Sequence, residues 1–517
     1  MPRTFEWCGR TGLFAVGPAA LSLLLGLWGI TRDNSMWRDE AATWQASHRT
    51  VPEIWHLLDR IDVVHGLYYL FMHEVFAVAG DSLVVLRLPS VLAMAGAAAL
   101  ITLLGARLAG RCAGLGAGLA FALIPAVQQY AQEGRPYALV TACAALACLL
   151  LVAGVERPGA GRWAAYGATV LIAALLNWFS LLMLCAHAVT IVLARPPRAT
   201  VLRWAAAAAC AVAGALPLVV ASSAQSQQVA WIRPVTAGTL TGLLLTLAAG
   251  TLCAWAVLSA AAARRAAQAQ FPPPPHSPSR SRPSPARLTL AAVGLPLLAV
   301  PPLVLLAVSL FRPVYLTRYV LFSHLGLALL IGGACHALAL RLRTPPRRTV
   351  AGVMTLAFLG LLPVQLSLRD ATGRIDDVLA TAASVAAARE DGDGVLYIPA
   401  ARRDTALVSP VEFTGIRDLA LVREPLGSGT MNGVEGSPDR IAHAMLAARR
   451  ILVVSDVGAP PATTDRDRAK QRVLKAHFVR CSETVTGGRQ VTVYERRSGE
   501  PAPGRHHAGA RRSGQRP

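Results

Sequence analysis

Apolar runs long enough to cross a lipid bilayer recur from residue 12 to residue 366 of this 517-residue chain. A helix needs about 20 mostly apolar residues to span roughly 30 Å of hydrocarbon. With 54% hydrophobic and only 15% charged residues, the chain is too apolar for an ordinary soluble protein. The sequence therefore predicts an α-helical integral membrane protein. We count about eleven candidate spans. They lie near residues 12–30, 83–105, 112–128, 137–155, 163–177, 180–194, 204–221, 238–263, 288–310, 319–340 and 349–366.

The loops between these runs differ in charge from one side of the membrane to the other. If the segment 66–79 does not span, the loops on the N-terminal side carry eighteen arginines against two acids, Glu6 and Glu156. Such an excess of arginine marks cytoplasmic loops. We therefore expect a multi-pass protein of the bacterial cytoplasmic membrane with a cytoplasmic N-terminus. Because 66–79 is short and holds His73 and Glu74, we interpret it as an amphipathic helix in the interface of the first outer loop.

Changes in composition along the chain predict two domains and two flexible segments. Residues 1–368 form the predicted membrane domain. Its segment 264–287 is rich in Pro, Ser and Arg and is expected to be a disordered cytoplasmic linker. Residues 369–497 are more polar and are expected to form a small extracytoplasmic α/β domain, and the tail 498–517 is expected to be disordered.

Local patterns predict the elements of the polar domain. The segments GVLYIPA and RILVVSDV are typical of short buried strands, and RIDDVLATAASVAAARE and SPDRIAHAMLAARR are typical of helices. Asp370, Asp376 and Asp377 stand near the start of the first of these helices. Acids are favoured at helix N-termini, so we interpret them as solvated helix-start charges.

Two adjacent acids in the first outer loop are the leading candidates for catalysis. Asp39 and Glu40 follow the first apolar run and are bracketed by Trp37 and Trp44. Ionisable residues at the membrane indicate a functional site, and a carboxylate here could act as a general base on a sugar or lipid hydroxyl. A solvated loop or a helix cap is the alternative that the spacing leaves open.

Arginines and aromatic residues in and near the other outer loops suit an anionic ligand. The planar guanidinium of Arg135 could bind phosphate oxygens, and Arg87, inside the second run, is expected to face the bundle and pair with an acid or a phosphate. In RPVYLTRY, spacings of three and four predict that Tyr315, Arg318 and Tyr319 lie on one side of a helical turn. Snorkelling arginines and interfacial aromatic anchors are the alternative.

Taken in order along the chain, these residues resemble the GT-C glycosyltransferases, and among them the bacterial protein O-mannosyltransferases and aminoarabinose-transferase-like proteins. The resemblance covers most of residues 1–340. The usual His-Pro-Pro-Leu reads His65-Gly66-Leu67-Tyr68 here, and Glu133 stands where some relatives have aspartate. The motifs that carry it are Asp39-Glu40 after the first span, His-x-x-Tyr-Tyr from His65 to Tyr69, Arg-Leu-Pro-Ser from Arg87 to Ser90, Gln-Glu-x-Arg-x-Tyr from Gln132 to Tyr137, and Arg318-Tyr319 at a late span.

The resemblance implies an inverting transfer of a sugar, with mannose as the first choice, from a polyprenyl-phosphate donor to an acceptor hydroxyl on a glycan, lipid or protein. The transfer would take place at the outer face of the membrane. Asp39 is implied to be the base, with Glu40 in support and Glu133 as a further acid. No cofactor and no nucleic acid are predicted, and a divalent metal requirement is left open. The residues predicted to bind the donor phosphate or the substrate are Arg135, Arg318, Arg312, Arg87, Tyr137, Tyr319, His65, Tyr69, Gln132 and Trp231.

Two other classes of function compete with this hypothesis. A transporter or flippase of a lipid-linked glycan precursor would need repeated halves and broken helices that converge on a midplane site. The sequence shows no internal repeat, and its polar residues gather at one surface. A scaffold or sensor that works through its outer domain would make the membrane arginines incidental. Metalloprotease, nucleotide-binding and Gly-x-Ser-x-Gly hydrolase motifs do not occur in the sequence.

Overall fold

The chain divides into two compact units. The computed structural model describes residues 6–225, 232–270, 288–458 and 462–497. The first, which we call the membrane unit, comprises Met1–Asn34 and Ala46–Gly373, and the second, the C-terminal unit, comprises Ser35–Gln45 and Arg374–Pro517. The segment Ser35–Gln45, which follows the first apolar run, therefore belongs with the C-terminal part of the chain. The division falls within helix α2, which runs from Arg38 to Ser47.

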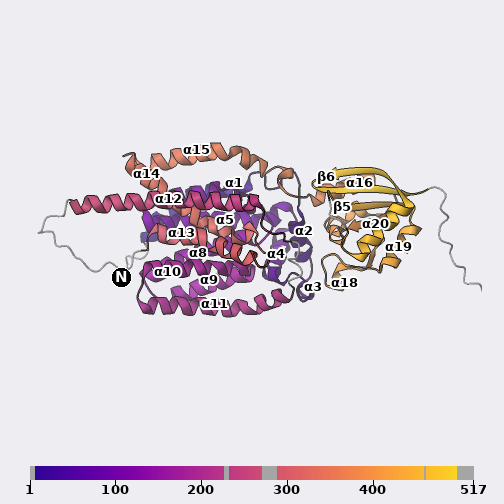
Figure 1. Cartoon of the computed structure of the whole chain (residues 1–517), viewed down its shortest axis with the longest axis horizontal. Helices are drawn as coiled ribbons and strands as arrows, with labels where there is room; N and C mark the ends of the chain where they lie inside the picture. The colour runs from indigo at the N-terminus through magenta and orange to yellow at the C-terminus, as the bar shows by residue number, and fades with distance from the viewer. Residues whose placement is uncertain (1–5, 226–231, 271–287, 459–461, 498–517) are drawn as a thin grey trace, which may run out of the picture. The chain divides into compact units, whose positions relative to one another are not determined.

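Every apolar run of the sequence is helical in the membrane unit. Helix α15 packs against α14, and α11 packs against α9 (Figure 1). The run 112–128 is bent by 62° between α6 and α7, at the bond before Pro125. The helices are α1 (Glu6–Leu27), α5 (Leu83–Ala109), α6 (Arg111–Leu123), α7 (Pro125–Ala131), α8 (Tyr137–Glu156), α9 (Ala160–Leu176), α10 (Leu182–Ala194), α11 (Arg198–Ala224), α12 (Ala237–Gln270), α13 (Leu290–Ser309), α14 (His324–Arg341) and α15 (Pro346–Ser367).

The lengths of these helices set the number of candidate spans. Within the described residues, seven helices are long and apolar enough to cross a membrane, or eight if the bent pair α6 and α7 counts as one span. Helices α9 and α10 and the apolar part of α1 have 17 residues or fewer. The prediction of a multi-pass helical protein is therefore confirmed, whereas the number eleven stays a prediction.

Small residues let the central helices approach closely. A Cβ atom added to Gly105 of α5 would lie 2.9 Å from the Cα of Gly114 in α6. A Cβ atom on Gly332 of α14 would lie 2.3 Å from the carbonyl oxygen of Ala113. Such positions tolerate no larger side chain, and close backbone contact through small residues is the usual packing mode of membrane helices.

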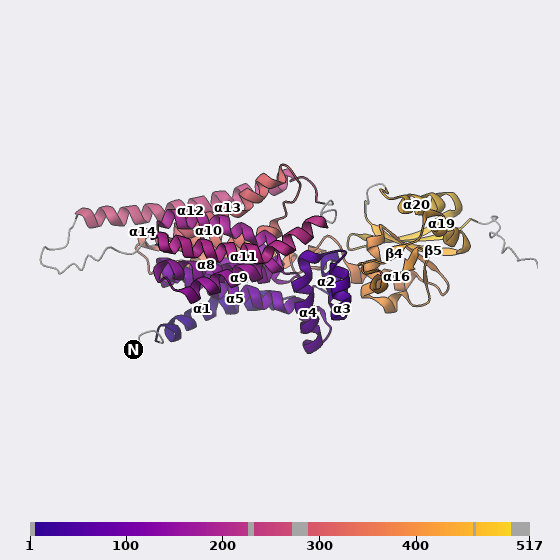
Figure 2. The same ribbon diagram turned by 90° about the horizontal axis from the view of Figure 1, so that it is seen from below.

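Three short helices fill the rest of the segment between α1 and α5 in the membrane unit: α3 (Val51–Leu58), the 3-10 helix η1 (Val63–His65) and α4 (Gly66–Ala79). At the start of α3 the backbone N–H of Thr50 donates to Glu53 Oε2 at 2.9 Å, which is half of a capping box. Helix α3 packs against α4 (Figure 2). Helix α4 has the bounds that the sequence predicts for the interfacial helix, and its placement in the interface stays a prediction.

The C-terminal unit is a mixed sheet with helices on both faces. The strand order is β2-β1-β5-β7-β6, with β1 parallel to β2 and β5, and with β7 antiparallel to both β5 and β6. The strands and helices are α16 (Val378–Ala388), β1 (Gly394–Ile398), α17 (Asp404–Val408), β2 (Arg417–Asp418), β3 (Leu421–Arg423), α18 (Pro425–Ser428), β4 (Val434–Glu435), α19 (Pro438–Ala447), β5 (Arg450–Asp456), α20 (Asp465–His477), β6 (Phe478–Thr486) and β7 (Arg489–Arg496).

Alternation along the central strands divides the apolar core of this unit into two layers. Leu396 and Val453 face one cluster together with Ile441 of α19 and Leu474 of α20. Val395, Tyr397, Leu452 and Val454 face the other cluster together with Val385 of α16. Each helix therefore buries one apolar stripe against the sheet, as expected from a side-chain period of two in the strands.

One expectation about this unit is wrong and others lie outside the described residues. Asp376 and Asp377 are 1% and 5% exposed, so they are not solvated charges. Asp377 accepts hydrogen bonds from the N–H groups of Leu379 and Ala380 and so caps α16, while Asp376 forms ion pairs described below. The first part of the predicted linker 264–287 is helical, because α12 continues to Gln270. The rest of this linker lies outside the described residues. Trp231 and the predicted disordered tail 498–517 also lie outside them.

Candidate functional site

A histidine and an arginine from different loops meet in the membrane unit. His65 ends η1, and Arg135 lies in the short turn between α7 and α8. One guanidinium nitrogen, Nη2 of Arg135, is 2.7 Å from Nε2 of His65. Arg135 and His65 are 6% and 7% exposed. Burial, followed by the charges of Arg135 and Arg318, holds the pKa of His65 well below its ordinary value, so its imidazole is neutral.

The turn that carries Arg135 is fixed by backbone contacts. The N–H of Arg135 donates to the carbonyl oxygen of Glu133 at 2.8 Å, and the hydroxyl of Ser90 in α5 donates to the same oxygen at 2.6 Å. A Cβ atom on Gly134 would lie 2.5 Å from Leu86. Glu133 is 1% exposed. The turn therefore holds the carboxylate of Glu133 and the guanidinium of Arg135 in buried positions.

A tyrosine and an aspartate extend this cluster along α4. The hydroxyl of Tyr69 donates to Oδ2 of Asp62 at 2.6 Å. Burial and then the charge of Asp62 raise the pKa of Tyr69 well above its ordinary value, while the charge of Arg135 acts in the opposite direction. Tyr69 is completely buried. It therefore remains a hydrogen-bond donor and does not ionise.

Arg318 approaches the same cluster from a later part of the chain, together with three aromatic rings. Its Cζ atom lies 5.7 Å from the ring centroid of Tyr137. Tyr319 is stacked on Phe179 at 4.6 Å with an interplanar angle of 10°, and its centroid is 6.2 Å from that of Tyr137. The guanidinium of Arg318 is therefore bordered by aromatic surface, an arrangement that stabilises a cation.

The local structure around Arg318 corrects one prediction. Leu316 is extended, with φ −130° and ψ 133°, and the 3-10 helix η4 begins only at Thr317 and ends at Ser323. Tyr315 therefore precedes the helix, where it is buried against Leu305 and Val320, and it does not share a helical turn with Arg318 and Tyr319. The pattern of three and four was ambiguous because a loop can hold the same residues. Arg312 is exposed.

Two predicted substrate-binding residues hold the end of α1. The amide nitrogen of Gln132 donates to the carbonyl oxygens of Gly26 and Trp28, at 2.9 and 2.7 Å. Arg87 is completely buried, and its Nη1 donates to the carbonyl oxygen of Ile30 at 2.6 Å. Gln132 therefore satisfies a carbonyl group that α1 leaves open at its C-terminus, and both side chains fix the turn that follows this helix.

The candidate catalytic acids lie in the C-terminal unit. Asp39 and Glu40 occupy the first turn of α2, where the helix dipole favours negative charge. Glu40 is completely buried, whereas Asp39 is partly exposed. The helix-start position agrees with the alternative that the sequence left open. Their participation in a site with Glu133 or Arg135 stays a prediction.

Sequence reasoning missed residues that shape this cluster. Asp62 adopts a left-handed conformation, with φ 63°, just before η1. Gln225, at the end of α11, accepts from the N–H of Val63 at 3.0 Å and donates to the carbonyl oxygen of Leu58 at 2.8 Å. Asp62 lies three residues before His65, which is a local signal, but the partners of Gln225 are far away in the sequence.

No group of three or more His, Cys, Asp or Glu side chains in the described part of the chain is placed to hold a metal ion.

Comparison with known proteins identifies the fold. A family model described as dolichyl-phosphate-mannose-protein mannosyltransferase matches residues 66–223. No curated protein matches the chain. ArnT from Cupriavidus metallidurans in the apo state aligns over 95% of this chain and 98% of its own, with 13% identity and a TM-score of 0.58. The chain has the GT-C fold. ArnT bound to undecaprenyl phosphate aligns over 94% of this chain and 98% of its own, with 12% identity and a TM-score of 0.60.

The shared GT-C fold extends beyond the membrane unit. An alignment over 95% of the chain includes most of the C-terminal unit. The family model, by contrast, ends before α12. The predicted GT-C architecture with a C-terminal α/β domain is therefore confirmed at the level of the fold.

Proposed function

We propose that this chain transfers a sugar from a polyprenyl-phosphate donor to an acceptor hydroxyl. The observation that carries the proposal is the cluster of the buried Arg135 and the half-buried Arg318 around the neutral His65, in a fold shared with an ArnT that was solved with undecaprenyl phosphate. Two guanidinium groups that act on one neutral imidazole create a positive potential around the buried His65. A lipid phosphate is an anion that such a site would bind.

A cavity beside Arg318 suits the lipid portion of this donor. It has a volume of about 450 Å³ and is lined by residues of α12, α13 and the segment around η4. Thr317, the residue before Arg318, is part of its wall, as are the apolar side chains of Leu243, Leu298 and Pro302. A largely apolar cavity whose wall includes the residue before Arg318 is our candidate site for the isoprenoid chain of the donor.

In the proposed reaction the acceptor oxygen attacks the anomeric carbon of the donor sugar. The bond between this carbon and the phosphate oxygen breaks, and the configuration inverts. The acceptor proton passes to a carboxylate, for which Asp39 is our candidate, with Glu40 in support and Glu133 as a further acid. Arg135 and Arg318 would stabilise the negative charge that develops on the leaving phosphate. Different residues would therefore accept the proton and neutralise the phosphate.

The sugar and the orientation belong to the same proposal. Mannose is our first choice because the matching family model describes mannosyltransferases. The acceptor is a hydroxyl on a glycan, a lipid or a protein. We place the reaction at the outer face of the bacterial cytoplasmic membrane, with the N-terminus inside, because the arginine excess of the opposite loops marks them as cytoplasmic.

Asp39→Asn tests the proposed reaction. Glycan and lipid profiling of a deletion strain identifies the acceptor, and the purified protein in liposomes is then assayed with a polyprenyl-phosphate sugar. We expect Asp39→Asn to lower turnover about 10²- to 10⁴-fold, the usual effect of losing a general base. Asp59→Asn, at an exposed acid of the same loop, is the matched control. Wild-type turnover in Asp39→Asn would remove Asp39 from the mechanism, and movement of intact lipid-linked sugar between leaflets would favour a flippase.

A further inference from the structure

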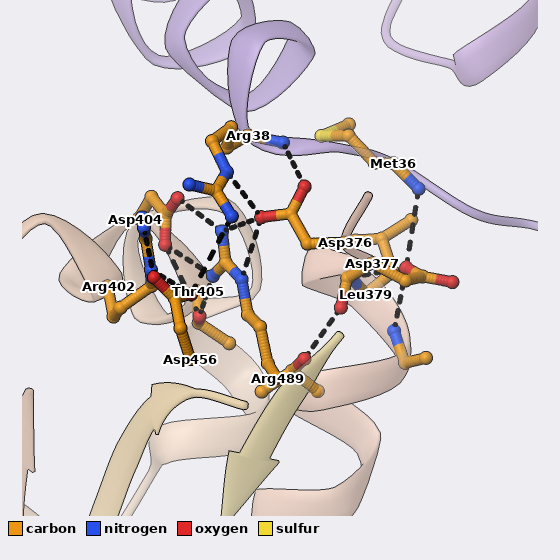
Figure 3. A network of polar contacts seen from close by, with 12 residues as sticks. Met36, Arg38, Asp376, Asp377, Leu379, Arg402, Asp404, Thr405, Asp456 and Arg489 are labelled. Atoms are coloured by element: carbon orange, nitrogen blue, oxygen red, sulfur yellow. Dashed lines mark hydrogen bonds and ion pairs between the residues drawn. The ribbon is translucent and has the colours of Figure 1, made fainter. Parts of the chain in front are cut away.

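The segment that carries Asp39 is bound to the polar domain of the C-terminal unit through its neighbour Arg38. Nε of Arg38 donates to Oδ2 of Asp376 at 2.8 Å, and its backbone N–H donates to Oδ1 of the same carboxylate at 3.2 Å. A second guanidinium nitrogen is 3.6 Å from Oδ1 of Asp456. Figure 3 shows Arg38 reaching into this network from above. The first residue of α2 is thus held by both its backbone and its side chain.

The backbone before Arg38 is held as well. The N–H of Val378 donates to the carbonyl oxygen of Met36 at 2.7 Å. The N–H of Met36 is 3.4 Å from Oδ1 of Asp377, which also caps α16 (Figure 3). These contacts do not depend on the side chain at position 36. They fix the direction in which the chain enters α2.

Asp376 is itself held by a completely buried arginine. Nη2 of Arg489 donates to Oδ2 of Asp376 at 2.8 Å, and Nη1 donates to Oδ1 of Asp404 at 2.6 Å (Figure 3). The side chains of Arg489 and Asp376 are both 0% exposed. Because Asp376 accepts from Arg489 and from Arg38 with the same oxygen, its position is determined from two sides.

A glycine turn brings Arg489 to this position. Gly487 and Gly488 join β6 to β7 with φ values of 52° and 75°, which other residues rarely adopt. A Cβ atom on Gly488 would lie 2.1 Å from the carbonyl oxygen of Ile375, and the N–H of Asp377 donates to the carbonyl oxygen of Gly487 at 2.8 Å. The turn therefore packs directly on the segment that carries Asp376.

From these contacts we propose that Asp376, supported by Arg489, is a positioning residue that acts through Arg38 to fix the first turn of α2. This inference rests on the proposed function, because that turn carries Asp39 and Glu40. A buried ion pair usually adds little net stability, but its geometry can select one conformation. In this protein the selected conformation is that of the turn with the proposed general base. The C-terminal unit then contributes to turnover without Asp376 touching the donor or the acceptor.

Arg38→Ala and Asp376→Asn test the inference in the full-length protein in liposomes. We expect Arg38→Ala to lower kcat about 10- to 100-fold, since small misplacements of a reacting group have effects of this size. The KM for the polyprenyl-phosphate sugar should stay within about twofold, because the donor phosphate is bound elsewhere. Asp376→Asn should have a similar effect, and the double variant should be no worse than Arg38→Ala alone. Arg38→Lys should recover part of kcat.

Glu435→Gln is the matched control for damage to the C-terminal unit. Glu435 accepts from Arg403 at 2.9 Å and from the completely buried Lys470 at 2.8 Å. These ion pairs are buried like that of Asp376, and no contact of Glu435 with Ser35–Gln45 occurs among the described hydrogen bonds and ion pairs. Glu435→Gln should keep wild-type kcat below its melting temperature. Arg38→Ala leaves the pairs of Arg489 with Asp376 and Asp404 in place, so it tests positioning even if Asp376→Asn does not fold.

The outcomes separate this inference from the proposed function. If the wild type transfers sugar and Arg38→Ala has wild-type kcat, the inference is overturned and the proposed function stands. An equal loss of kcat in Glu435→Gln would also overturn it, since a general structural role would then explain both. If the wild type transfers no sugar from any polyprenyl-phosphate donor, the proposed function fails, and the inference fails with it.

Discussion

Arg318→Ala should weaken binding of a polyprenyl phosphate more than any other single change outside the buried core. Arg318 is only half-buried, whereas Arg135 is 6% exposed, so truncation of Arg318 should disturb the fold less. Its guanidinium lies beside Tyr137 and contributes to the charge that keeps His65 neutral. Loss of this cation removes one of the two positive groups that we assign to the donor phosphate.

The size of the effect follows from the setting of the side chain. A hydrogen bond to a charged group contributes about 1.5–3 kcal/mol, and partial exposure favours the lower part of that range. We therefore expect a loss of about 2 kcal/mol, which is about 30-fold in Kd at roughly 1.4 kcal/mol per tenfold. The contribution should shrink at high salt, because salt screens a half-exposed pair.

Titration of undecaprenyl phosphate into the protein in nanodiscs measures this Kd. Arg341→Ala is the matched control, because Cζ of Arg341 lies 5.7 Å from the ring centroid of Trp255, the same distance as that of Arg318 from Tyr137. It should leave Kd unchanged. A Kd within twofold of the wild type for Arg318→Ala would refute the assignment. An equal loss for Arg341→Ala would show that the effect is not specific to the site.

The remaining predictions concern protonation and topology. The pKa of His65 is lowered in the folded protein. Below about pH 6.5 the unfolded chain therefore binds a proton at His65 and the folded chain does not. The free energy of unfolding should then fall with acidification by up to about 1.4 kcal/mol per pH unit. The melting temperature between pH 7 and 5 should therefore drop more steeply for the wild type than for His65→Gln, and equal slopes would contradict a neutral His65. A reporter fused at Pro275 should be active in the cytoplasm and one at Ser498 outside it, and the opposite result would discard the proposed orientation.

The sequence predicted the elements that depend on local pattern. Helix α4 has the bounds expected from the apolar segment 66–79, and strands β1 and β5 lie within the two segments that were predicted to be buried strands. Hydropathy and period act within a few residues, so they suffice for such elements. The bend between α6 and α7 escaped the same reasoning, although Pro125 disfavours a helical conformation at Ile124, which is extended. An unbroken apolar run concealed it.

The candidate site could be predicted only in part, because its contacts join distant residues. His65 and Arg135 were each singled out, yet nothing local indicates that their side chains meet across 70 residues. For Asp376 the local pattern was misleading. An acid before a helix is usually solvated, whereas here Arg489 and Arg38 lie 113 and 338 residues away and take it out of water.

Because of the same long-range pairing, the boundary between the two units does not coincide with the change in composition along the chain. Composition shifts near residue 369, and a division there separates an apolar part from a polar part. The contacts of Arg38 and Met36 instead assign Ser35–Gln45 to the C-terminal unit. Hydropathy reports the solvent that a segment prefers, while unit membership depends on which backbone and charged groups it pairs with. A polar loop that follows α1 is free to pair with either part, and this one pairs with the carboxylates that follow α15. Truncating the chain at the compositional boundary would therefore remove the partners of the turn that carries Asp39, although no candidate catalytic residue lies beyond the cut.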